Sequence, residues 1–475
     1  MAYAAVLLAA ACVSHFAILI NDAFPLRWQA DHLSLSHPES FFNGFFPIVY
    51  PLLLRMATAI TGNPLLTLIL FQIALAPLYA ILAYRLLREF VSERATLLAL
   101  PFVLFSPHVV RAILNPTPEF LASLAVLTGL ATFARANGMK SVVLAGVGVG
   151  IGCLFRSHVI VLAAGFVVAI LTIESRNLKM LAFFLAGVLP FVILQGLLQV
   201  WTGHGFFENL QAFNVWKTMY GMDWNNPPMI GKTSAFQVIM LDPLLFLKWY
   251  SVRLLNTSPY LITLIALPIV AARTFHVKRS LVLLSVATLF YIIVTTAGSS
   301  SQNLTLAIPV VVATAIFLVE MVAARILQPR MVVVALASVT IAIALAGLFY
   351  YFSLTSKRIE DYADVEKVLE INSSADASRV YADDFDMYFP NLNYATPRTS
   401  GGWPGIGIPN YAEEYPQIRD SSAKIEHDDL VRNGILWAVF RTPPYDAHGY
   451  ENIQSDSSLF RLIYRTKFHE IYRVQ

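Results

Sequence analysis

The sequence predicts a polytopic α-helical membrane protein, with about eleven transmembrane helices and a small α/β domain at its C-terminal end. Two compositional observations support this fold class: 57% of the 475 residues are hydrophobic and only 13% are charged, roughly half the charged fraction of a soluble domain. Long apolar runs recur up to residue 352, and short apolar segments separated by polar residues follow. No basic cluster with interleaved aromatic residues is present, so nucleic acid is not an expected partner.

A helix that crosses roughly 30 Å of hydrocarbon needs about 20 apolar residues. By this criterion we expect spans near 3–20, 64–84, 95–111, 118–134, 141–155, 157–173, 180–201, 258–273, 280–297, 304–324 and 331–352. The fifth and sixth of these form one apolar run interrupted only around Arg156 and His158. We therefore expect two short helices that meet at this polar tip.

The positions of Lys and Arg in short loops predict the orientation, because positive residues stay on the cytoplasmic side. With the N-terminus in the cytoplasm, twelve of these residues fall in inner loops and four in outer loops. A multi-pass protein of the plasma membrane results, with loops 21–63 and 202–257 on the external face. Residues 1–352 form its transmembrane domain, and residues 353–475 form an extracytoplasmic α/β domain.

The C-terminal segment contains patterns of both helix and strand. Apolar spacing predicts a helix over 364–371 and a second one over 428–434 that ends on Gly434. Short apolar runs predict strands over 377–382, 434–440 and 459–466.

The polar stretch 21–44 directly follows the first span. Its aromatic and aliphatic residues, such as Phe24 and Trp28, are interleaved with charges, which is typical of a helix that lies flat in the membrane interface. Asp22 stands at the mouth of the span. Its carboxylate could accept a proton from an alcohol or bind a divalent cation, and equally it could cap the interfacial helix.

Glu119 is a second candidate, at the outer end of the third span. Pro116 and Pro118 precede it, so it falls in the first turn of a helix, where an acid stabilises the helix dipole. A carboxylate at membrane depth is also costly and often functional. Both interpretations stay open.

The remaining candidates are basic or aromatic. Arg156 has the planar fork that suits phosphate, although an arginine there could also extend to the interface. His158 is expected to hydrogen-bond locally. Lys217 lies in loop 202–257, whose aromatic and amide residues suit sugars and equally suit an interfacial belt.

Two stretches, "NDAFPLRWQADHL" and "FFNGFFPIVYPLLLRMATAITGNPLL", resemble the first external loop of the GT-C superfamily of membrane glycosyltransferases. Two later ones, "NPTPEFLASLAVL" and "LAGVGVGIGCLFRSHVIVL", resemble the family's second external loop and its Gly-rich helix. The first acid of the family's pair is Asn21 here, and Ser301 to Asn303 occupy a position where relatives often carry an arginine. The residues that match the first-loop pattern are Asp22, Ala23, Phe24, Arg27, Ala30, Asn43, Gly44, Tyr50, Pro51 and Leu52.

The resemblance implies a GT-C-like enzyme of the mannosyltransferase or arabinosyltransferase type. Such an enzyme moves a hexosyl or pentosyl group from a polyprenyl-phosphate sugar donor to a hydroxyl of an extracytoplasmic glycolipid or envelope glycan. Asp22 would then be the general base, and Glu119 would help it hold a divalent cation, Mg or Mn. Arg27, Arg156, His158 and Lys217 would bind substrate.

Two other functions stay open. A flippase or transporter for lipid-linked glycans would need broken midplane segments in symmetric halves, whereas the polar residues here cluster at the outer face and no repeat is visible. An envelope glycan ligase or polymerase would use a lipid diphosphate donor instead.

Overall fold

The structure is a computed structural model that describes most of the helical part of the chain and the C-terminal strands. The described residues are 2–13, 30, 33, 35, 41, 47–61, 64–135, 138–173, 178–203, 215, 219, 234–273, 277–298, 304–326, 338, 342, 345–346, 348–349, 364–365, 367–369, 371–372, 379–382, 394–395, 427, 431, 434–441, 458–466 and 469–475.

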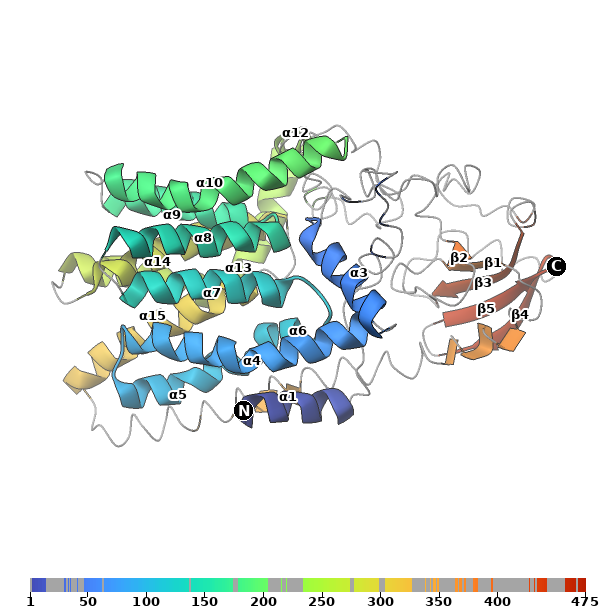
Figure 1. Cartoon of the computed structure of the whole chain (residues 1–475), viewed down its shortest axis with the longest axis horizontal. Helices are drawn as coiled ribbons and strands as arrows, with labels where there is room; N and C mark the ends of the chain where they lie inside the picture. The colour runs from blue at the N-terminus through green and yellow to red at the C-terminus, as the bar shows by residue number, and fades with distance from the viewer. Residues whose placement is uncertain are drawn as a thin grey trace.

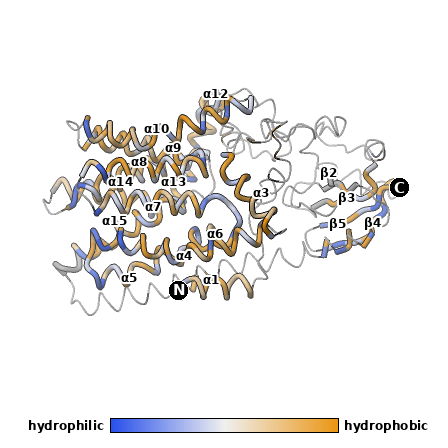
Figure 2. The backbone as a smooth tube through the Cα atoms, viewed as in Figure 1, coloured by the Kyte–Doolittle hydropathy of each residue, from blue (hydrophilic) through white to orange (hydrophobic). Residues whose placement is uncertain are grey.

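A bundle of roughly aligned helices makes up the N-terminal part, and α3 lies across one end of it (Figure 1). Hydrophobic residues dominate these helices (Figure 2). The described helices are α1 (Ala2–Val13), α3 (Val49–Thr61), α4 (Pro64–Arg88), α5 (Glu93–Leu104), α6 (Pro107–Leu114), α7 (Glu119–Arg135), α8 (Met139–Phe155), α9 (Val159–Ile173), α10 (Leu178–Trp201), α12 (Ala235–Leu241), α13 (Pro243–Arg273), α14 (Arg279–Thr296) and α15 (Leu304–Ile326).

Five helices in the described part of the chain are long and apolar enough to cross a membrane: α4, α10, α13, α14 and α15. A sixth span results if the bent pair α5 and α6 counts as one. Helices α1, α3, α8 and α9 are apolar but shorter. The multi-pass helical class is thus confirmed and the count of eleven spans is not, since the expected span 331–352 lies outside the described residues except at isolated positions.

Two expected spans have different boundaries in the structure. The span expected at 95–111 is two helices that meet at 56°, because Ser106 caps α6 and Pro107 at its first position lacks the N–H that would continue α5. The span expected from 258 begins at Pro243 instead, since Lys248 and Arg253 weaken its apolar signal without interrupting the helix.

Helices α8 and α9 confirm the two short helices expected around the polar tip. The amide of Arg156 donates to the Gly152 carbonyl, and the amide of Val159 donates to the Arg156 carbonyl. The chain therefore reverses within three residues at one end of the bundle.

The C-terminal strands form one five-stranded sheet in the order β2-β1-β3-β5-β4. Strand β1 pairs in parallel with β2 and β3, whereas β5 pairs antiparallel with β3 and β4. Trp437 is fully buried in the sheet's core, and Gly434, directly before β3, has a φ of 69°. The strands are β1 (Arg379–Ala382), β2 (Tyr394–Ala395), β3 (Ile435–Arg441), β4 (Phe460–Arg465) and β5 (His469–Val474).

Three of these strands, β1, β3 and β4, were expected from the sequence. The short β2 and the last strand, β5, were missed, because Glu470 and Arg473 interrupt the apolar alternation that marks a strand. Both charged side chains have partners within the sheet: Arg465 pairs with Glu470, and Arg473 lies over the Trp437 ring with its guanidinium carbon 5.3 Å from the ring centroid.

Candidate functional site

Glu119 and Arg156 form an ion pair at one end of the bundle. Glu119 begins α7 and Arg156 follows α8, so the antiparallel packing of the two helices brings their side chains together. Arg156 Nη2 donates to Glu119 Oε1, and only 11% and 4% of the two side chains are exposed. Such a pair is removed from water, so each charge depends on the other for its stability.

Polar side chains from three further helices surround this ion pair. Its charges act on the hydroxyls of Tyr50 at the start of α3 and Tyr291 near the end of α14, both of which are fully buried. Gln72 of α4 lies beside Tyr50, and its Nε2 donates to the Thr117 carbonyl over 3.4 Å. Five elements of the bundle therefore converge on one buried polar cluster.

Several oxygens of this cluster have no hydrogen-bond partner among the residues that the structure describes. They are Tyr50 Oη, Gln72 Oε1, Thr117 Oγ1 and Glu119 Oε2, all inaccessible to solvent. Native structures rarely leave buried polar atoms unpaired, because each one costs the desolvation of its group. The cluster therefore has the polar atoms of a site that a ligand or ordered water completes.

His158 lies on the turn between α8 and α9, outside both helices. Its ring contacts that of Tyr291, with 6.1 Å between the ring centroids. Burial lowers the pKa of His158 well below its ordinary value, and the nearby Arg156 guanidinium lowers it further. The imidazole is therefore neutral near pH 7, where it can donate or accept a hydrogen bond.

Arg253 is a second partly buried arginine near this end of the bundle. It lies on α13 one turn beyond Tyr250, whose hydroxyl donates to the Ile293 carbonyl of α14 over 2.8 Å. Ile293 follows Tyr291 by two residues along α14. Arg253 on α13 and the ion pair near Tyr291 therefore lie at similar depths in the bundle. One terminal nitrogen of Arg253 is buried, and no described residue accepts a hydrogen bond from it.

The described residues do not fit a divalent metal ion. No group of three or more His, Cys, Asp or Glu side chains occurs in this part of the chain. Glu119 already compensates a guanidinium, whereas a divalent cation needs several uncommitted oxygen ligands. The other predicted ligand, Asp22, lies outside the described residues, so a metal held by Asp22 and Glu119 stays a prediction.

The structure brings together three of the predicted site residues: Glu119, Arg156 and His158. The other three, Asp22, Arg27 and Lys217, lie outside the described residues and stay predictions. Sequence reasoning missed the roles of Tyr50 and Gln72. Gln72 could have been found from the sequence because it is a single amide inside the apolar run "LILFQIAL". Tyr50 could have been found because it belongs to the first-loop pattern.

The bundle of apolar helices and the small C-terminal sheet define a multi-pass helical membrane protein with a sheet at its C-terminal end. A crystal structure of ArnT from Cupriavidus metallidurans bound to undecaprenyl phosphate is similar to it, with a TM-score of 0.56 at 14% sequence identity over 99% of this chain and 97% of ArnT. The apo form of ArnT gives a TM-score of 0.54 at 13% identity, with the same coverage.

Weaker similarity extends to the archaeal oligosaccharyltransferase AglB from Archaeoglobus fulgidus, in complex with an inhibitory peptide and a dolichol-phosphate. Its TM-score is 0.48 at 13% identity, over 92% of this chain and 69% of AglB. Residues 46–198 match the family described as dolichyl-phosphate-mannose-protein mannosyltransferase, a range that includes Tyr50, Gln72, Glu119 and Arg156. No curated protein sequence matches the chain. The resemblance to GT-C proteins is thus confirmed at the level of the fold.

Proposed function

We propose that this protein is a membrane glycosyltransferase that moves a hexosyl or pentosyl group from a polyprenyl-phosphate donor to a hydroxyl of an extracytoplasmic glycolipid or envelope glycan. The observation that carries this proposal is the buried Glu119–Arg156 pair with its unpaired oxygens, in a fold that resembles ArnT bound to undecaprenyl phosphate over nearly its whole length. The site combines charge for a phosphate with neutral oxygens for hydroxyl groups.

The reaction requires a base for the acceptor and a cation for the leaving group. The acceptor oxygen attacks the anomeric carbon of the donor, the bond from that carbon to the phosphate oxygen breaks, and the lipid phosphate leaves. Asp22 takes the proton of the acceptor hydroxyl, as its position at the mouth of the first span suggests. An arginine stabilises the charge that develops on the phosphate.

Two arginines are candidates for this phosphate contact. Arg156 is already compensated by Glu119, so it offers a phosphate less net charge. Arg253 has one buried nitrogen without an acceptor in the described structure, and a partly buried guanidinium favours an anionic partner. We therefore assign the larger part of phosphate binding to Arg253, and to Arg156 the positioning of groups around it.

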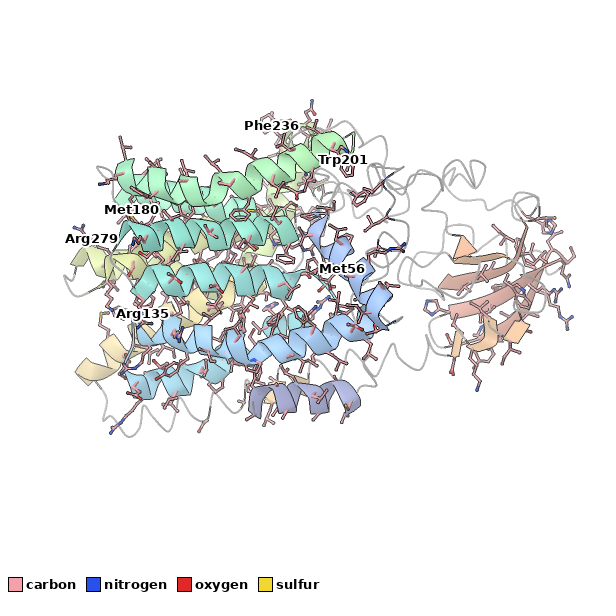
Figure 3. The ribbon with its side chains drawn as sticks, viewed as in Figure 1. Met56, Arg135, Met180, Trp201, Phe236 and Arg279 are labelled. Atoms are coloured by element: carbon pink, nitrogen blue, oxygen red, sulfur yellow. The ribbon has the colours of Figure 1, made fainter. Side chains whose placement is uncertain are left out.

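The distribution of basic residues supports a site on the extracytoplasmic side. Arg135 and Arg279 lie at one end of the bundle together with Met180, whereas Met56 and Trp201 lie at the other end (Figure 3). The positive-inside rule makes the first end cytoplasmic. The ion pair, at the end of α8 beside α3, then lies toward the external face.

The proposal is tested by turnover in membranes supplied with polyprenyl-phosphate sugars. We expect Asp22→Asn to lower turnover by about 10² to 10⁴-fold, the usual contribution of a general base, while donor binding survives. Unchanged turnover in Asp22→Asn would reject this residue as the base.

Arg253→Gln should instead weaken donor binding, and Arg135→Gln at the opposite end is the matched control. Formation of a new glycosylated product separates a transferase from a flippase, which only relocates its lipid. Parallel assays with polyprenyl-diphosphate sugars identify the ligase or polymerase alternative, since only that class would depend on the diphosphate.

A further inference from the structure

Two buried glutamines lie in the last two turns of α10, an otherwise apolar span. Gln195 is 8% exposed and Gln199 is 4% exposed, although the span has a mean hydropathy of 2.3. Their spacing of four residues places them on the same face of the helix. Amides at membrane depth are costly unless they have hydrogen-bond partners, and polar residues in such positions are often functional.

This face of α10 packs against α8. A Cβ on Gly187 or on Gly146 would collide with the backbone of the opposite helix, and one on Gly150 would collide with Phe191. These contacts show that the two helices run in the same direction in a fixed register. Continued one and two turns beyond Phe191, this register would bring Gln195 level with the last turn of α8 and Gln199 level with the turn that carries Arg156 and His158.

Gln195 has an unpaired acceptor in this position. Its Oε1 is buried, and no residue in the described ranges donates a hydrogen bond to it. The hydroxyl of the nearby Thr202, by contrast, has a hydrogen-bond partner, since it donates to the backbone carbonyl of Gln199 over 2.8 Å. The Trp201 ring also contacts Phe41 of the first external loop, with 5.2 Å between the ring centroids. Gln195 therefore carries a buried acceptor, without a described donor, on the face of α10 that packs against α8.

We propose that Gln195 and Gln199 bind the hydroxyl groups of a sugar at this site. A side-chain amide offers both a donor and an acceptor, which matches a hydroxyl group, whereas a phosphate is better matched by the arginines. The inference rests on the proposed function, which supplies two sources of such hydroxyls: the sugar carried by the lipid donor and the sugar of the acceptor. The amides would select among sugars without taking part in bond breaking.

The test compares Gln195→Leu and Gln199→Leu with the wild-type protein in detergent. Leu197→Ala is the matched control, because Leu197 lies on the exposed face of the same helix turn. One arm measures binding of polyprenyl phosphate and of polyprenyl-phosphate mannose, arabinose and glucose. The second arm measures binding of the methyl glycosides of the same sugars, which stand in for an acceptor.

If the amides bind the donor sugar, each Leu variant weakens binding of a sugar-bearing lipid about 5- to 10-fold, the range expected for lost neutral hydrogen bonds, and leaves polyprenyl phosphate unaffected. If they bind the acceptor, only the methyl glycosides lose affinity. Unchanged affinities in both arms would overturn the inference. Failure of the wild-type protein to bind any polyprenyl phosphate would overturn the proposed function instead, and the glycoside arm would still decide on the amides.

Discussion

At the residue scale, the Glu119–Arg156 pair is the part of the site most sensitive to change. Both side chains are buried, so each charge is far from water and is compensated mainly by the other. A buried pair adds little net stability, yet removal of one partner is costly because it leaves the other charge uncompensated. The pair therefore fixes the end of α8 against the start of α7.

Splitting the pair gives the first prediction. Arg156→Gln should lower the free energy of unfolding by about 3–5 kcal/mol, because Glu119 then stays buried without a counter-charge. The double variant Glu119→Gln/Arg156→Gln should recover most of this loss. Denaturant unfolding in detergent measures both, and a double variant as unstable as Arg156→Gln would show that the two charges do not depend on each other.

His158 gives a prediction about pH. Its pKa in the folded protein is lowered by burial and by Arg156, whereas in the unfolded chain it is about 6.5. As the pH falls below about 6.5, His158 takes up a proton in the unfolded chain while it stays neutral in the folded protein. The stability of the folded state is therefore fully present above this pH and decreases toward acid. Melting temperatures measured in detergent between about pH 5 and 8 should fall less steeply toward acid for His158→Gln than for the wild type. Parallel curves would contradict the prediction.

At the element scale, close contact between helices positions both the ion pair and the amides. Helix α8 touches α10 at Gly146 and Gly187, where a Cβ on either would come within 2.3 Å of a backbone oxygen of the other helix. Rigid backbone on both sides cannot give way as a flexible side chain would. The register of α8 and α10, and with it the height of Gln195 relative to α8, depends on these two glycines.

Gly146→Ala tests this dependence. The added methyl must push the two helices apart, and we expect it to lower the free energy of unfolding by about 1–3 kcal/mol and to weaken substrate binding. Gly138→Ala is the control, because a Cβ there meets no atom within 4 Å. Thermal unfolding of the two variants side by side gives the answer. Equal stability of Gly146→Ala and Gly138→Ala would mean that the helices can separate at little cost.

At the scale of the whole molecule, the orientation of the chain decides on which face the site opens. Helix α7 runs from Glu119 to Arg135, so the ion pair lies at the end of the bundle opposite Arg135, where Figure 3 also places Arg279. In Figure 1, the C-terminal sheet lies beyond the end that carries α3. The ion pair and the sheet are thus found at the same end of the molecule, and we propose that this end is extracytoplasmic.

Cysteine labelling of intact cells tests this orientation. Of the two native cysteines, Cys12 is exposed and Cys153 is buried, so Cys12→Ser provides a suitable background. A membrane-impermeant maleimide should label Ser458→Cys, in the exposed turn two residues before β4, and should leave Arg135→Cys unlabelled until the cells are broken. The reverse labelling pattern would show that the protein has the opposite orientation and that the site faces the cytoplasm.

Most of the helical architecture could be predicted from apolar run lengths. The division of residues 141–173 into two short helices followed from three polar residues in one long run, and the structure confirms it. The bend between α5 and α6 was missed, since the Ser-Pro pair that causes it lies within an apolar stretch. Helix α3 was missed because its polar neighbours indicated a loop.

Within the site, the sequence by itself determined which residues are chemically suited to it. Glu119, Arg156 and His158 stand out because ionisable groups in an apolar chain are costly wherever a span ends. Only the tertiary structure decided that Glu119 pairs with Arg156 and that Tyr50 and Gln72 lie close by. The physical reason is that hydropathy records how deep a residue lies in the membrane, whereas side-chain partners depend on the register between helices, which is set by small residues such as Gly146 and Gly187.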